Sequence, residues 1–135
     1  MFARGDAKLL MGLSGNMPKN NIVTIVIEGK RCASKKNNRR NFGRISLPSK
    51  AYENFHALVG LDLIPWQGSI TKPFRINIDY TIKGKYHQDL DNAVSSVLDV
   101  LKDYQVIPDD EFCLEIKAKK QQGKDWKIVI CLEEI

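Results

Sequence analysis

The most regular pattern along the chain is an alternation of apolar and polar residues over positions 74–83. Apolar side chains occupy every second position from Phe74 to Ile82, and polar side chains fill all of the positions between them. Because successive side chains of a strand point to opposite faces, this pattern predicts a strand with one buried face. A denser β-branched run at 22–27, closed by Gly29, predicts a strand that is buried on both faces.

Two other stretches have apolar residues at helical spacing. Ser49 can cap a helix that ends near Gly60 and whose apolar positions are Tyr52, Phe55, Leu58 and Val59. A second helix is predicted to begin near Asp91, with an apolar stripe formed by Val94, Val97, Leu98 and Leu101.

The C-terminal part of the chain predicts two further strands, at about 112–118 and 126–132, joined by a turn at 122–125. The element order is then β-α-β-α-β-β without internal repeats. This order indicates one small α+β domain, residues 21–135, with a mixed β-sheet and two main helices. Regular patterning begins only at Asn21, so we expect residues 1–20 to form a weakly structured N-terminal extension.

Composition narrows the class of protein. The 135 residues suit one domain with one core, and the net charge of +5 favours a polyanionic partner. No apolar run approaches the roughly 20 residues that cross a bilayer, so no membrane association is expected. The three cysteines are scattered, without a Cys-x-x-Cys or Cys/His cluster, which argues against a disulfide framework or a zinc site. We therefore expect a cytoplasmic protein.

Positive charge concentrates in residues 30–44, which contain no acidic residue. Such a segment cannot bury itself, so it is predicted to be a loop or arm. It is either a surface for phosphate groups or an ordinary solvated loop, and its composition alone leaves both readings open. Its basic residues are Lys30, Arg31, Lys35, Lys36, Arg39, Arg40 and Arg44.

Acidic residues flank the second predicted helix, with Asp89 and Asp91 at its start and Asp110 just past its end. Residues two apart share a face only in extended chain, so Asp89 and Asp91 converge most easily where the chain enters the helix. The chain after the helix is long enough to bring Asp110 back to the helix start, although the spacing does not force this. Three carboxylates that meet need a cation among them, and all-oxygen ligands favour Mg²⁺ or Mn²⁺ over zinc.

The alternative reading of the acidic residues is purely structural. An Asp-x-Asp at the start of a helix usually supplies a cap and complements the helix dipole. Pro108-Asp109-Asp110 is likewise typical of a turn. The combination of these acids with a basic segment in so short a chain favours metal-dependent hydrolysis of a phosphodiester.

This combination resembles the RusA-like Holliday junction resolvases, small endonucleases common in phages and prophages. The resemblance rests on Asp89-Leu90-Asp91-Asn92, on an amphipathic helix with Asp99, and on Asp109-Asp110. Upstream, SKKNNRR (34–40) and LPSKAY (47–52) look like the basic loop and the following helix start of such sequences. Together the motifs cover roughly residues 22–120, which is most of the chain.

The resemblance implies a homodimer of mixed α/β subunits that cuts branched DNA by paired, Mg²⁺-dependent nicks in recombination and repair. The family's catalytic, metal-binding aspartates map onto Asp89, Asp91 and Asp110. Members of the family often carry a lysine one helical turn after the second aspartate, where this chain has Ser95. Three other lysines are candidates for the missing charge: Lys83, Lys85 and Lys102.

We therefore predict an endodeoxyribonuclease that uses Mg²⁺ or Mn²⁺, needs no small-molecule cofactor, and attacks the phosphodiester with a metal-activated water. One alternative is a non-catalytic or weakly active, structure-selective DNA-binding protein of the same family. Another is a basic interaction module whose acidic residues only cap a helix. The expected substrate is cytoplasmic, nucleoid-associated DNA. Seven basic residues are expected to contact its phosphate backbone without reading bases: Lys35, Lys36, Arg39, Arg40, Arg44, Lys83 and Lys85.

Overall fold

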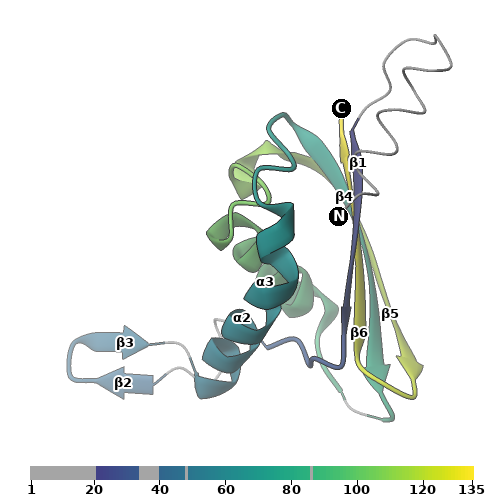
Figure 1. Ribbon diagram of the computed structural model, residues 1–135. Helices are drawn as coiled ribbons and strands as arrows, with labels where there is room; N and C mark the ends of the chain where they lie inside the picture. Colours follow the sequence, from purple (N-terminus) through teal and green to yellow (C-terminus); the bar gives the residue numbers. More distant parts are fainter. Residues whose placement is uncertain (1–20, 34–39, 48, 86) are drawn as a thin grey trace, which may run out of the picture.

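The computed structural model describes residues 21–33, 40–47, 49–85 and 87–135. Its main elements are the strands β1 (Ile22–Glu28), β4 (Phe74–Lys83), β5 (Cys113–Gly123) and β6 (Lys127–Glu134), and the helices α2 (Lys50–Leu63) and α3 (Leu90–Asp103). The four strands form one sheet in the order β1-β6-β4-β5, and both helices lie on the same face of it (Figure 1). Strands β4 and β5 are parallel and the other neighbours antiparallel, which confirms the predicted α+β class with a mixed sheet.

The core lies between the sheet and the two helices. The predicted alternation in β4 is confirmed, because Ile76, Ile78 and Tyr80 are fully buried while the residues between them are exposed or half-buried. The apolar side of α3 includes Val97 and Leu101, as predicted. Its buried positions also include Ala93, Ser96 and Val100, whereas Val94 and Leu98 are only partly buried.

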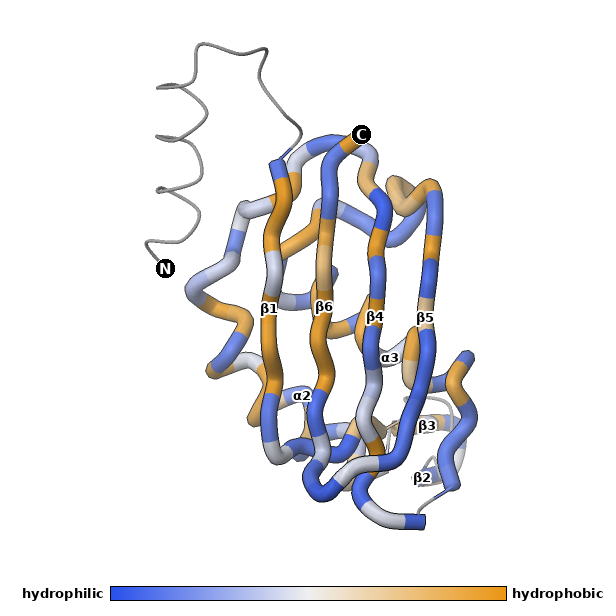
Figure 2. Tube along the Cα trace, turned by 90° about the vertical axis from the view of Figure 1, so that its right-hand side faces the viewer, coloured by the Kyte–Doolittle hydropathy of each residue, from blue (hydrophilic) through white to orange (hydrophobic). Residues whose placement is uncertain are grey.

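The prediction that the first strand is buried on both faces is wrong. In β1 buried and exposed residues alternate, with Ile22 52% and Val26 44% exposed. The reason is the position of the strand, which lies at one edge of a sheet whose helices cover a single face. Figure 2 shows the sheet from the side away from the helices, with hydrophobic residues concentrated along β1 and β6. The β-branched residues on the buried face therefore reflect burial, whereas those on the exposed face reflect only the preference of such residues for strands.

Helix α2 begins as predicted but ends later than predicted. Ser49 caps it, and its hydroxyl oxygen accepts a hydrogen bond from the Tyr52 backbone N–H (3.1 Å). The helix continues through Gly60 to Leu63. A Cβ atom at Gly60 would overlap the ring of Tyr104, so the glycine permits close packing with the end of α3 and does not stop the helix.

Part of the predicted basic loop is a β-hairpin. Strands β2 (Arg40–Phe42) and β3 (Ile45–Leu47) pair antiparallel around Gly43, which has a φ of 62°. A two-residue turn with a positive φ at its first central position is a common hairpin connection. Residues 40–44, which were predicted to form a loop or arm, therefore belong to a paired hairpin and not to an irregular loop. Residues 34–39 and the extension predicted at 1–20 lie outside the described residues.

Strand β4, helix α3 and strand β5 form a β-α-β unit. Helix α3 runs back along the sheet from the C-terminal end of β4, and a short 3₁₀ helix, η2 (Asp110–Phe112), then leads into β5. Strand β5 is five residues longer at its C-terminal end than predicted, so it reaches back to the start of α3. Another short 3₁₀ helix, η1 (Ile64–Trp66), follows α2. Within the described ranges, no helix has the length and apolar character needed to cross a membrane.

Candidate metal and nucleic-acid site

Asp89 occupies the N-cap position of α3, but its carboxylate does not act as the cap. Its backbone carbonyl accepts a hydrogen bond from the Ala93 N–H (3.2 Å), whereas its side chain makes no capping hydrogen bond. Asp91 lies in the first turn, and its Oδ1 accepts a hydrogen bond from the Asn92 backbone N–H (2.9 Å). Both residues are exposed. The Asp89 carboxylate therefore remains available to a ligand, which the purely structural reading did not expect.

A buried tyrosine fixes the residue that precedes Asp89. The Tyr80 hydroxyl donates a hydrogen bond to Gln88 Oε1 (2.6 Å) and accepts one from the Cys32 backbone N–H (3.1 Å). The Gln88 side-chain amide in turn donates to the Cys32 carbonyl. Burial raises the pKa of the Tyr80 hydroxyl, so this hydroxyl stays protonated and remains a donor. The start of α3 is thereby attached to β4 and to the chain that leaves β1.

The root of the basic segment lies against the first turns of α3. The Cys32 thiol donates to the Ala93 carbonyl (3.6 Å), and the Ser96 hydroxyl donates to the Ala33 carbonyl (2.6 Å). Burial raises the pKa of the Cys32 thiol to about 12, so it acts as a weak neutral donor and not as a nucleophile. Residues Lys35 and Lys36 follow Ala33 closely in sequence. Cys32 and Ala33 of the basic segment therefore lie beside the first turns of the helix that carries Asp89 and Asp91.

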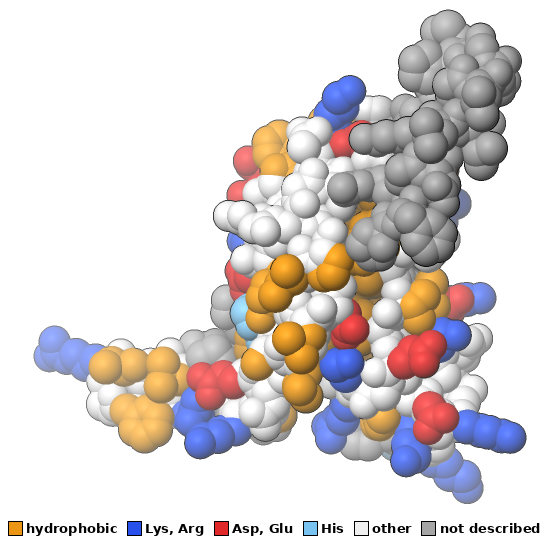
Figure 3. Space-filling view, in the orientation of Figure 1, with side chains coloured by type: hydrophobic (Ala, Val, Ile, Leu, Met, Phe, Trp, Pro, Cys, Tyr) orange, Lys and Arg blue, Asp and Glu red, His pale blue; other side chains and the backbone are white. Residues whose placement is uncertain are grey.

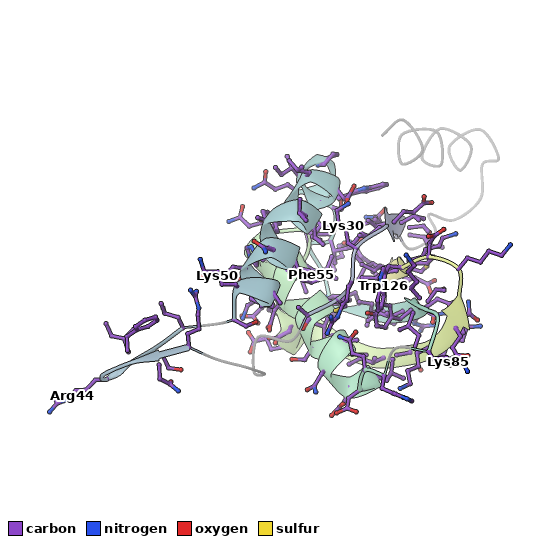
Figure 4. The ribbon with its side chains drawn as sticks, turned by 90° about the horizontal axis from the view of Figure 1, so that it is seen from below. Lys30, Arg44, Lys50, Phe55, Lys85 and Trp126 are labelled. Atoms are coloured by element: carbon purple, nitrogen blue, oxygen red, sulfur yellow. The ribbon has the colours of Figure 1, made fainter. Side chains whose placement is uncertain are left out.

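The predicted phosphate-binding residues do not all lie in one patch. Lys35, Lys36 and Arg39 lie outside the described residues. Arg40 pairs with Glu53 of α2 (2.7 Å), and Arg44 lies at the far end of the hairpin. Figure 4 shows Arg44 and Lys85 far apart, on different sides of the molecule. Lys83 and Lys85 are exposed at the end of β4, on the chain that leads to Asp89.

Lys120 is a site residue that the sequence interpretation missed. Strand β5 runs parallel to β4 and pairs Lys120 with Tyr80, which brings the lysine to the start of α3. Its Nζ donates a hydrogen bond to the Gln88 carbonyl (2.7 Å), one residue before Asp89. The signal in the sequence was the spacing of Ile116, Ala118 and Lys120, which share one face of a strand.

Asp110 lies at the opposite end of α3 from Asp89 and Asp91. It belongs to η2, where a hydrogen bond with the Asp109 side chain raises the pKa of Asp110 and nearby Lys102 opposes that rise. Since α3 has 14 residues, its two ends are about 21 Å apart. No group of three potential metal ligands from His, Cys, Asp and Glu occurs in the part of the chain that the structure describes.

The predicted meeting of three carboxylates within one chain is therefore not observed. The physical reason is the parallel β-α-β unit, which places the beginning of β5 beside the end of α3 and not beside its start. The chain does return to the helix start, but it does so ten residues later, at Lys120. Asp109 behaves as a turn residue, since its Oδ1 accepts a hydrogen bond from the Glu111 N–H (3.4 Å).

Ser95 is partly buried on α3 beside Ser96, whose hydroxyl binds the Ala33 carbonyl. Comparison of the chain with protein-family models and with curated proteins gives no match.

Proposed function

We propose that this protein is a metal-dependent endonuclease that hydrolyses phosphodiester bonds in branched DNA. The observation that carries the proposal is the start of α3. Two exposed carboxylates, Asp89 and Asp91, lie there, the Lys120 ammonium binds the backbone carbonyl of the residue before Asp89, and Ala33 of the basic segment is bonded to the same helix. Carboxylates next to cations are the groups that hold metal ions and a phosphate together.

The donor chemistry of this site fits Mg²⁺ or Mn²⁺. Both ligand side chains supply oxygen, the Asp89 carboxylate makes no capping hydrogen bond, and both are open to solvent. The ion, when bound, lowers the pKa of a water molecule and neutralises charge that develops on the phosphate. Asp89 and Asp91 would hold the ion, and Lys120 would attract a phosphate oxygen from the side of β5. The Tyr80 and Gln88 hydrogen bonds keep the start of α3 in place while the substrate binds.

Asp110 has a place in this proposal only if a second subunit supplies it. Strand β5 has a strand neighbour on one side only among the described residues, and its Leu114 (64%) and Ile116 (48%) are exposed. Antiparallel pairing of two β5 edges about Ile116 would set Glu115 of each copy opposite Lys117 of the other. Opposite charges at paired positions stabilise such a register, whereas pairing about Glu115 or Lys117 would place like charges together.

The same register would carry Asp110 of one copy to the end of β5 that holds Lys120 in the other. In this register the ladder would end with Cys113 of one copy opposite Lys119 of the other, so η2 with Asp110 would continue past that pair, towards Lys120, which contacts Gln88. Both pairs of helices would lie on the same face of the combined sheet. The expected homodimer would thus unite Asp110 with Asp89 and Asp91, which one chain keeps apart.

A non-catalytic DNA-binding protein is the second candidate. It is favoured by the separation of Asp110 from Asp89 and Asp91 within one chain, and by Ser95 at the position of the family lysine. In that case the cations would still hold DNA, but no phosphodiester would be cut.

The deciding experiment is nicking of an end-labelled four-way junction and of a matched duplex, with Mg²⁺ and with a chelator. We expect Mg²⁺-dependent cutting of the junction, and loss of cutting with retained DNA binding in Asp89→Asn, Asp91→Asn and Asp110→Asn. Asp125→Asn, in the exposed turn before β6, is the matched control and should cut normally. Binding without cutting supports the second candidate. Absence of both contradicts a nucleic-acid function.

Mixing two inactive variants tests the shared site directly. If Asp91 of one copy works with Asp110 of the other, a heterodimer of Asp91→Asn and Asp110→Asn contains one site with both substitutions and one intact site. The mixture should therefore regain single-strand nicking after subunit exchange. If each site is built within one chain, every site carries a substitution and the mixture stays inactive.

A further inference from the structure

The β2–β3 hairpin has an apolar face that is exposed to solvent. Phe42 pairs with Ile45, and Arg40 pairs with Leu47, so these four side chains share one face of the hairpin. On that face Phe42 is 58%, Ile45 61% and Leu47 38% exposed. An isolated two-stranded hairpin is only marginally stable in water, so a projecting hairpin with exposed apolar side chains suits a surface that meets a partner.

The hairpin presents its aromatic ring together with positive charge. It stands away from the sheet and helices, and the ion pair between Arg40 and Glu53 ties its base to α2 (Figures 1 and 4). The turn formed by Gly43 and Arg44 places the arginine at the tip, next to the pair of Phe42 and Ile45. Figure 3 shows hydrophobic side chains gathered on the hairpin with Lys or Arg side chains at its end.

We propose that the hairpin binds at the centre of a DNA branch point and that Phe42 stacks there on an exposed base pair. This inference rests on the proposed function and extends it to the part of the substrate that the hairpin recognises. Residues 40–47 contain no acid, and Arg44 at the tip is not part of the Arg40–Glu53 ion pair, so surrounding phosphates attract the tip of the hairpin. The same charge disfavours a second copy of the hairpin as its partner. Stacking on an aromatic ring is tolerant of base identity, which suits a protein that reads DNA shape.

The physical chemistry of stacking explains why a branch point is favoured over continuous duplex. In intact duplex an inserted apolar side chain must first separate two stacked base pairs, and this separation opposes binding. At a branch point the last base pair of each arm can expose one face without that cost. Phe42 should therefore contribute to junction binding and contribute little to duplex binding.

The test measures the affinity of full-length protein for a four-way junction and for a matched duplex, with chelator present so that no strand is cut. Phe42→Ala should weaken junction binding about tenfold or more while duplex binding changes less than about twofold. Phe42→Trp should retain junction binding. Leu61→Ala, which removes a 72% exposed side chain from α2, is the matched control and should leave both affinities unchanged. Arg44→Gln should weaken binding to the junction and to the duplex by similar factors.

Three results would overturn the proposal. An equal loss on junction and duplex would mean that Phe42 does not recognise the branch. Unchanged affinity for both would place the hairpin outside the DNA interface. Conversion of a dimer to a monomer by Phe42→Ala, seen by sedimentation velocity, would assign the apolar face to a second copy. Each result leaves Mg²⁺-dependent cutting by wild type intact, so the inference can fail without the proposed function failing.

Discussion

Replacing Tyr80 by phenylalanine tests whether the buried hydroxyl holds the candidate site together. The hydroxyl is bonded to Gln88 on one side and to the Cys32 backbone N–H on the other. Tyr80→Phe keeps the ring, which packs in the core at 1% exposure, and removes only the oxygen. Two hydrogen bonds are lost, and the N–H of buried Cys32 is left without its partner.

The expected loss of stability follows from these two bonds. Each hydrogen bond contributes about 1 kcal/mol net, and an unsatisfied buried donor adds to the loss, so Tyr80→Phe should lower the free energy of unfolding by about 2 kcal/mol. For a domain of this size that corresponds to a fall of about 8 °C in the melting temperature. Urea denaturation at constant m-value gives the free energy, and single-turnover cleavage of a junction gives the functional effect. We expect cleavage to slow even where the variant is fully folded, because the start of α3 loses its attachment to β4.

Tyr52 supplies the matched control. It is also a buried tyrosine, but among the described residues its hydroxyl has no hydrogen-bond partner. Tyr52→Phe removes a buried polar atom that gains nothing from folding, so stability should stay the same or rise. If the two substitutions change stability equally, or if Tyr80→Phe costs less than about 0.5 kcal/mol, the Tyr80 hydrogen bonds do not have the role assigned to them.

Three further predictions concern positively charged side chains. Lys120→Met should slow cleavage at saturating junction more than it weakens binding, because a cation that meets charge developing in the transition state acts on turnover. Ser95→Lys in the Lys120→Met background should restore part of the rate if the two positions serve the same phosphate. Single-turnover rates decide, and no loss in Lys120→Met would remove it from the site. Neutralising Lys35, Lys36, Arg39 and Arg40 together should weaken binding to all DNA sequences alike. The slope of log affinity against log salt concentration should become shallower by about 0.9 for each lost phosphate contact. An unchanged slope would identify the segment as a solvated loop.

The main helices and strands were predictable because local patterns specify them, whereas the β2–β3 hairpin was not predicted. The alternation at 74–83 and the Ser49 cap specify their elements locally, and both are confirmed. Gly60 was misinterpreted because a glycine in a helical pattern has two explanations. It can end a helix, or it can admit a close neighbour. The neighbour, Tyr104, is 44 positions away in the sequence, so local pattern could not distinguish the two.

The candidate site was predictable in its first half only. Asp89 and Asp91 lie where the chain enters a helix, which is a local property of the sequence. The position of Asp110 depends on whether the strand after α3 runs parallel or antiparallel to β4. Chain length allowed either, and a mixed sheet does not say which pair is parallel. Recognition of a β-α-β unit would have placed Asp110 at the far end and Lys120 near Asp89.

The start of α3 is the one place in the described chain where the core and the candidate chemistry meet. Tyr80 is at once a buried residue of β4 and the hydrogen-bond partner of the residue before Asp89. The Gln88 backbone carbonyl also accepts a hydrogen bond from the Lys120 ammonium, and the Gln88 side-chain amide donates one to the Cys32 carbonyl. Three segments distant in sequence are therefore fixed relative to one helix start. The carboxylates themselves take no part in these bonds. The fold thus positions the backbone of Asp89 rigidly from the interior and leaves its side chain to the solvent, an arrangement that suits binding a ligand better than capping a helix.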